Sequence, residues 1–263
     1  MLEIVNPAAV GGGVAVATFV GILAALALGR WLGRHVMARH AAVALPGIGS
    51  LETAVFALLG LLIAFTFSGG LSRFDQRRAQ VVQEANAIGT AYLRLELLAP
   101  PAQPDLRKVF RDYVDSRIAT YRKVSELPAA QAELGRTQAL QAEIWRQAVA
   151  ATRQPGSHPQ AAMLVLPALN EMFDITTVRV AATQMHPPLI IYWMLIALAL
   201  ASALLAGYQS AGEKTIGWVH QVAFAGIIAF TVYVILDVEY PRLGFIRIDA
   251  IDELLVNVRA GMK

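Results

Sequence analysis

The stretch that decides the fold is residues 51–78, which read LETAVFALLGLLIAFTFSGGLSRFDQRR. Its first part is an apolar run interrupted only by Glu52, and three arginines and one aspartate gather between residues 73 and 78. A helix needs about 20 apolar residues to cross a bilayer, so this run is long enough to span one. The charges behind it are typical of the point where such a helix leaves the membrane. The sequence therefore predicts a transmembrane helix at residues 51–70.

Three further apolar blocks resemble this one in length: residues 8–29, 189–208 and 216–236. The first has no basic residue before it and has Arg30 and Arg34 behind it, which is typical of a membrane anchor rather than a cleaved signal. Only 16% of all residues are charged, whereas soluble domains carry about 25%. We therefore predict an all-α membrane protein with four transmembrane helices in two hairpins.

Polar residues concentrate between the second and third blocks. The helix that begins at residue 51 meets no proline before Pro100, so we expect it to continue out of the membrane to about Leu98. Further helices are predicted at residues 104–126, 128–153 and 160–183, with a loop between the last two. The predicted layout is a first hairpin at residues 1–70, a helical domain at 71–187, a second hairpin at 188–237, and an amphipathic tail at 238–263.

The distribution of basic residues predicts the orientation. Four spans place the helical domain and both termini on one side, which carries arginines close to the membrane. The opposite side carries Arg30, Arg34, Arg39 and Lys214. The positive-inside rule favours a cytoplasmic domain and a multi-pass protein of the bacterial inner membrane.

Several classes of site are not expected. The chain has no cysteine, which excludes disulfides and thiolate sites. Its net charge of +3 suits a lipid surface, and no basic-aromatic module points to nucleic acid. His35 and His40 do not share a helix face, so metal is not expected there, and Gly11–Gly13 is typical of close helix packing. We find no catalytic set, and we predict neither an enzyme nor a cofactor.

Two stripes of the helix that begins at residue 51 are candidates for a pore lining. At about 100° per residue one stripe is apolar in its membrane half, and the opposite stripe is small and polar. Either stripe could line a pore between several copies, or simply pack on neighbours or face water. The pore-lining candidates are Phe56, Leu59, Ile63 and Phe67. Candidates for the pore entrance or the cytoplasmic path are Glu52, Ser68, Ser72, Arg77, Glu84, Asn86, Thr90 and Arg94. Glu52 has two open roles, as an ion-path residue or as an interfacial anchor.

The segment behind the fourth block is dense in charge. Residues 236–247 read LDVEYPRLGFIR, and its candidate residues are Asp237, Glu239, Pro241, Arg242 and Arg247. The two acids could pair with Arg73, Arg77 or Arg78, or could bind calcium through their oxygens. Ion pairs are favoured, because the carboxylates are few and lack the regular spacing of a calcium loop.

These segments together resemble a known family. The stretch LLGLLIAFTFS at residues 58–68 is followed by RFDxRR at 73–78 and by VVxEANAIGTAYLRL at 81–95. With the exit motif at residues 236–247, the chain resembles a family of bacterial membrane proteins labelled bestrophin-like. The resemblance covers the whole chain in layout.

The resemblance implies a function. Bestrophins are pentameric anion channels with four membrane helices per subunit and a helical cytosolic part. Their second helix lines the pore and forms an apolar neck, which carries over to Ile63 and Phe67, with Phe56 or Leu59 above. Asp237 and Glu239 match the position of the calcium-binding acidic cluster. The chain departs from bestrophins because it lacks their Pro-Ser-Phe element and their acidic run, which puts calcium gating in doubt.

The leading hypothesis is a homo-oligomeric ion channel in the cell membrane. A pentamer that conducts chloride or another inorganic or small organic anion is favoured, with membrane lipid and further copies of the chain as its other partners. The alternative is a non-conducting sensor or scaffold whose helical domain binds a protein.

Overall fold

The computed structural model describes residues 7–39, 48–124, 126–213, 217–242 and 244–263, and every regular element in these residues is a helix. The chain divides into two compact units. Unit 1 consists of Met1–Phe74 and His186–Ile246, and unit 2 of Asp75–Met185 and Arg247–Lys263. The prediction of an all-α chain is confirmed for the described residues.

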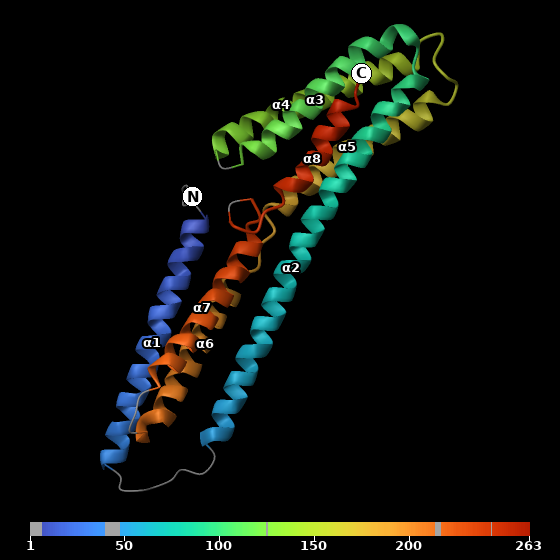
Figure 1. The fold of residues 1–263 in the computed structure, drawn as a ribbon. Helices are drawn as coiled ribbons and strands as arrows, with labels where there is room; N and C mark the ends of the chain where they lie inside the picture. The colour runs from blue at the N-terminus through green and yellow to red at the C-terminus, as the bar shows by residue number, and fades with distance from the viewer. Residues whose placement is uncertain (1–6, 40–47, 125, 214–216, 243) are drawn as a thin grey trace. The chain divides into compact units, whose positions relative to one another are not determined.

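Unit 1 is built on three helices that lie side by side (Figure 1). They are α1 (Pro7–Arg39), α6 (Leu189–Gln209) and α7 (Trp218–Glu239), and the short helix η3 (Ser210–Gly212) follows α6. Their shared core contains Ile22, Leu195 and Ile228, together with Leu59 from the next helix, α2. The outward faces are also apolar: Val20, Trp193 and Phe230 are 58%, 66% and 67% exposed. Large exposed apolar surfaces of this kind are typical of a face that contacts lipid.

Glycines allow α1 and α6 to approach each other closely. A Cβ atom on Gly29 would lie 2.0 Å from the carbonyl oxygen of Leu204, and one on Gly207 would lie 2.1 Å from that of Leu26. Small residues at such crossings let two backbones touch, which is a common way to pack helices in a membrane.

Helix α1 is longer than predicted. The sequence predicts a membrane span at residues 8–29, where the apolar block stops, whereas the helix continues to Arg39. The arginines at positions 30 and 34 end the apolar block, but neither breaks a helix, since arginine is a good helix former.

Helix α2 (Ile48–Arg94) runs without a break from unit 1 into unit 2. The prediction of a long helix is therefore confirmed. The short helix η1 (Leu95–Leu97) follows directly, and η2 (Pro100–Ala102) begins at the first of the two prolines.

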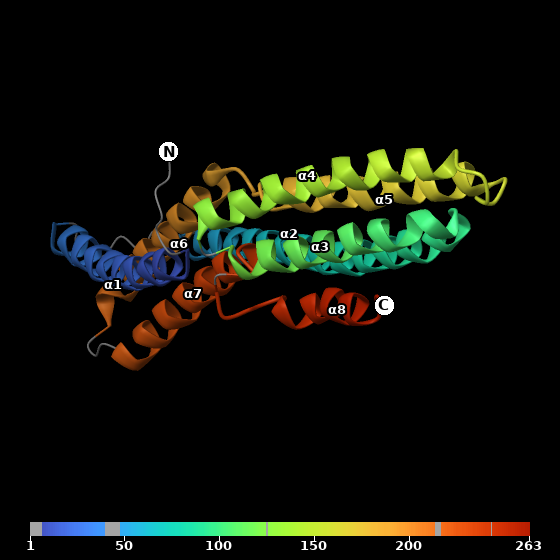
Figure 2. The same cartoon turned by 90° about the horizontal axis from the view of Figure 1, so that it is seen from above.

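Unit 2 contains α3 (Gln103–Arg122), α4 (Leu127–Thr152), α5 (Ala161–Ala182) and α8 (Asp249–Ala260), close to the predicted bounds. Helix α3 packs on α4 and α8, and α4 packs on α5 (Figure 2). Their core contains Phe110, Ile144, Leu169 and Leu255. The predicted loop at 154–159 is held by hydrogen bonds: the His158 amide donates to the Leu97 carbonyl at 2.8 Å, and the Ala99 amide donates to Ser157 Oγ at 2.8 Å.

Five helices of the described residues are long and apolar enough to cross a membrane, whereas the sequence predicts four. The stretches are Val10–Arg39, Gly49–Leu97, Ala161–Ala182, Leu189–Gly212 and Trp218–Glu239. The additional one is α5, which buries Val165, Leu169 and Met172 in the core of unit 2. Packing within its own unit therefore accounts for part of the apolar character of α5, while Met163 and Val178 are 77% and 47% exposed.

A few residues used in the sequence predictions lie outside the described part of the chain. They are His40, Lys214, Ile216 at the expected start of the fourth span, and Leu243 in the exit motif.

Candidate functional site

One face of α2 packs on the rest of unit 1. The ring of Phe56 meets the ring of Phe224 edge-on, with centroids 5.8 Å apart. Leu59 is 2% exposed in the apolar core, and Ile63 packs against that core. Phe67 is 38% exposed, and Glu52 is buried. Three of the four pore-lining candidates thus contact side chains of their own chain.

On the opposite side of α2, one row of residues is exposed in unit 1 and continues as an exposed row in unit 2. Its positions follow one another at intervals of three and four residues, which keeps them on one side of the helix. We call this surface the open face of α2, and its residues are Ala57, Leu61, Ala64, Ser68, Ser72, Asp75, Ala79, Gln83, Asn86 and Thr90. Every one of them is exposed, and Leu61 is the only large apolar side chain among them. Arg94, at the end of the helix, instead donates from Nη1 to the Leu164 carbonyl at 2.8 Å.

In unit 1, an ion cluster joins α2 to the end of α7. Arg73 donates hydrogen bonds to the Glu239 carboxylate. Its Nε lies 3.1 Å from Oε1 and 3.0 Å from Oε2, and its Nη2 lies 2.8 Å from Oε2. His186 Nδ1 lies 3.1 Å from the same carboxylate, and its ring stacks on Tyr240. The Glu239 side chain is 1% exposed. The predicted ion pairing of the exit motif is therefore formed, with Arg73 as the partner.

Asp237 organises the segment that follows α7. Its carboxylate accepts the backbone N–H groups of Phe245 at 3.0 Å and Ile246 at 2.7 Å, and the Tyr233 hydroxyl donates to it at 3.1 Å. A Cβ on Gly244 would lie 2.0 Å from Asp237 Oδ1, so this close turn requires glycine. Pro241 is buried and Arg242 half-buried within the same turn. Both acids of the motif therefore accept bonds from their own unit.

Metal ligands do not gather in the described part of the chain, where no group of three His, Asp or Glu side chains could hold an ion. Arg247, the last residue of the exit motif, is in unit 2 and pairs with Asp249 at 2.6 Å.

Arg77 lies in unit 2 and is 8% exposed. It donates from Nε to the Ala182 carbonyl at 3.3 Å and from Nη2 to the Met185 carbonyl at 3.2 Å. The Ala182 carbonyl is at the C-terminal end of α5, where a cation satisfies an acceptor that has no partner within the helix, and Met185 follows in the next turn.

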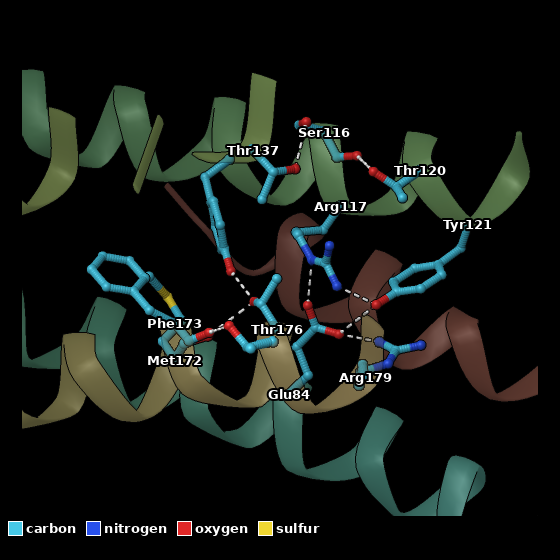
Figure 3. A network of polar contacts seen from close by, with 12 residues as sticks. Glu84, Ser116, Arg117, Thr120, Tyr121, Thr137, Met172, Phe173, Thr176 and Arg179 are labelled. Carbon is cyan, nitrogen blue, oxygen red and sulfur yellow. Dashed lines mark hydrogen bonds and ion pairs between the residues drawn. The ribbon is translucent and has the colours of Figure 1, made fainter. Parts of the chain in front are cut away.

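Glu84 is the centre of a buried charge network in unit 2 (Figure 3). Arg117 donates from Nε to its Oε1 at 2.6 Å, and Arg179 Nη1 donates to its Oε2. The Tyr121 hydroxyl also donates to Oε2, at 3.3 Å, and the Arg179 guanidinium lies 3.8 Å from the Tyr121 ring centroid. Arg179 reaches α8 as well, with Nη2 at 3.6 Å from Asp252. The network thus ties α2, α3, α5 and α8 together.

The electrostatics of this network favour an ionised Glu84. Burial by itself raises the pKa of the carboxyl, but Arg117 and Arg179 outweigh burial and hold the pKa below its ordinary value. Burial raises the pKa of Tyr113 to about 12, and its hydroxyl forms a hydrogen bond with Thr176 Oγ1 at 2.9 Å. Both groups are fixed in one protonation state at neutral pH.

Sequence reasoning found Glu84 but missed its partners. The sequence feature that could have indicated them is Arg117. It lies one turn after Tyr113, on the face of α3 that also carries Phe110. A cation inside an apolar stripe is rarely buried without an acid, so it points to a buried partner.

The chain matches a known protein family over most of its length. Residues 20–251 match the family described as the Bestrophin-like domain. No curated protein and no solved structure matches the chain.

Proposed function

Because this chain belongs to the bestrophin-like family, we propose that it forms a homo-oligomeric ion channel whose pore is lined by the open face of α2. The family points to a membrane channel, and the chain has several helices apolar enough for a multi-pass membrane protein. The observation that carries the proposal is the open face itself, because a row of exposed side chains that are small or polar apart from Leu61 suits a water-filled axis.

The open face is preferred over the apolar stripe. Phe56, Leu59 and Ile63 contact their own chain, which supports a role in packing the subunit rather than in a neck. On the open face Leu61 is 52% exposed and is the largest apolar side chain in the membrane half. A ring of Leu61 side chains is therefore the proposed constriction, with Ser68 and Ser72 following it along the pore. Arg77 and Glu84 then stabilise unit 2, whereas Asn86 and Thr90 continue the ion path.

The rest of the assignment follows from this arrangement. The spans are α1, the first part of α2, α6 and α7, and residues 71–187 form a cytoplasmic domain of an inner-membrane protein. We assign a pentamer from the family resemblance. Small anions such as chloride are the proposed cargo, because three arginines and one aspartate follow the apolar block of α2 between residues 73 and 78. The protein acts without chemical catalysis.

The test is chloride efflux from liposomes that contain the purified full chain, together with the mass of the particle in nanodiscs. Efflux above that of empty liposomes and a mass near five subunits are expected. Leu61→Ala should increase the efflux several-fold because it widens the constriction. The matched control is Leu28→Ala on α1, a leucine that is 50% exposed and should leave the efflux unchanged.

Two outcomes would contradict the proposal. Efflux equal to that of empty liposomes would exclude a channel. A monomeric or dimeric particle would exclude a pore lined by α2 and favour a sensor or scaffold instead.

A further inference from the structure

The arginines that follow the apolar part of α2 do not all act on the same side of the helix. Arg73 donates from Nη2 to Glu239 Oε2 at 2.8 Å. Arg77 is 8% exposed and donates to two carbonyl oxygens at and just after the end of α5. At about 100° per residue, both positions lie roughly 160° around the helix from Asp75 on the open face. Their charges are therefore used inside their own units, away from the open face.

Asp75 and Arg78 are the charges that stay at the open face. Asp75 is the only charged residue of that row, and its side chain is 59% exposed. Arg78 lies at the side of the row, is 50% exposed, and donates from Nη1 to Asp75 Oδ1 at 3.4 Å. An exposed pair of this kind is held only weakly, so both charges act on ions in the surrounding water.

Charge at the wall of a water-filled pore selects ions by their sign. A ring of carboxylates favours cations, and a ring of arginines favours anions. Copies of α2 around an axis would bring Asp75 of each copy to the wall, with Arg78 beside it. The two formal charges cancel, and the other residues of the open face carry no charge. The balance within this one pair should therefore decide which ion is preferred.

We propose that Asp75 and Arg78 together set the ion selectivity of the channel. Arg78 favours chloride, and Asp75 limits the preference for chloride over sodium. This inference rests on the proposed function and deepens it, because it names the residues that select the permeant ion.

The test is the reversal potential of the reconstituted full chain in a planar bilayer with a sodium chloride gradient, which gives the ratio of chloride to sodium permeability. Asp75→Asn leaves the arginine unopposed, so the ratio should rise by at least about threefold. Arg78→Gln leaves the acid unopposed, so the ratio should fall by at least about threefold. Both shifts should shrink at about 1 M salt, where the Debye length is only about 3 Å.

The matched control is a second exposed pair in unit 2 that is not on α2. Arg259 Nε on α8 lies 2.9 Å from Asp115 Oδ1 on α3, and the two side chains are 31% and 47% exposed. Asp115→Asn and Arg259→Gln change the charge in the same way and should leave the ratio unchanged. Asp75→Glu keeps the charge and should also keep the wild-type ratio. If one of the two variants at Asp75 and Arg78 does not fold, the direction of the shift in the other still tests the inference.

The outcomes separate this inference from the proposed function. Opposite shifts at Asp75 and Arg78, with constant ratios in the controls, support it. The inference alone is overturned if the channel conducts and both variants keep the wild-type ratio. It is also overturned if both variants shift the ratio in the same direction, which would indicate a change in pore shape. A wild type without current would overturn the channel and this inference together.

Discussion

At the scale of single residues, Gly244 gives the sharpest test of the turn after α7. The carboxylate of Asp237 occupies the space that a Cβ at this position would need. Gly244→Ala should therefore displace the carboxylate from the two backbone N–H groups that it accepts, at a cost of about 1–3 kcal/mol. The measurement is the thermal midpoint in detergent, with Gly226→Ala as control because a Cβ there meets nothing within 4 Å. Equal midpoints for the two variants would contradict the turn.

Glu84 gives a second test at this scale. Glu84→Gln removes the negative charge between Arg117 and Arg179, and breaking a buried ion pair of this kind costs about 3–5 kcal/mol. Glu143→Gln breaks an exposed pair with Arg146 instead and should change the stability very little. Chemical unfolding of the two variants in detergent compares them directly. A small effect at Glu84 would mean that the network does not hold unit 2 together.

The same carboxyl predicts a pH dependence. The folded protein lowers the pKa of Glu84, so its contribution to stability is complete above the ordinary value of 4.5 and is lost as the pH falls through the lowered pKa. The difference in stability between wild type and Glu84→Gln should therefore be constant near neutral pH and shrink in acid. A difference that grows as the pH falls below 4.5 would contradict the assigned direction.

At the scale of elements, the contact between α1 and α6 depends on glycine. Gly29→Ala should force the two backbones apart, because the added methyl carbon would lie 2.0 Å from the Leu204 carbonyl oxygen. A loss of about 1–3 kcal/mol is expected, as for other overpacked cores. Gly12→Ala on the same helix meets nothing within 4 Å and is the control. The measurement is the midpoint of thermal unfolding for the two variants. An unchanged midpoint for Gly29→Ala would exclude the close crossing of α1 and α6.

The positions of most helices were predictable from the sequence. The lengths of the apolar blocks and the charges at their ends indicated where the helices lie, because a membrane span must be long and apolar whatever its neighbours are. The end of α1 was not predictable from the same pattern, since hydropathy reports where a helix leaves the membrane and not where its hydrogen bonds stop. The choice between the two stripes of α2 also required the structure. Both stripes have helical spacing, and only the contact of Phe56 with Phe224 shows which one the chain covers.

The buried site was the least predictable part. Glu84 was visible on the helix, but its partners Arg117 and Arg179 lie 33 and 95 positions away. Periodicity describes one helix at a time and contains no information about which helices meet. The exit motif was easier, because its acids and Arg73 both lie at the ends of predicted spans.

At the scale of the whole molecule, the central claim is that copies of the chain surround a pore with the open face of α2. The chain has no cysteine, so a single introduced thiol can be modified without background. Ser68 is exposed on the open face, whereas Thr66, two residues before it, is 8% exposed and donates to the Leu62 carbonyl at 2.7 Å. The two positions therefore separate a pore lining from a packed face.

The most direct measurement is the current through reconstituted Ser68→Cys and Thr66→Cys channels before and after a charged methanethiosulfonate reagent. We predict that the reagent changes the current of Ser68→Cys within seconds and leaves that of Thr66→Cys unchanged. Modification that affects Thr66→Cys and spares Ser68→Cys would contradict the claim and assign the pore to the apolar stripe.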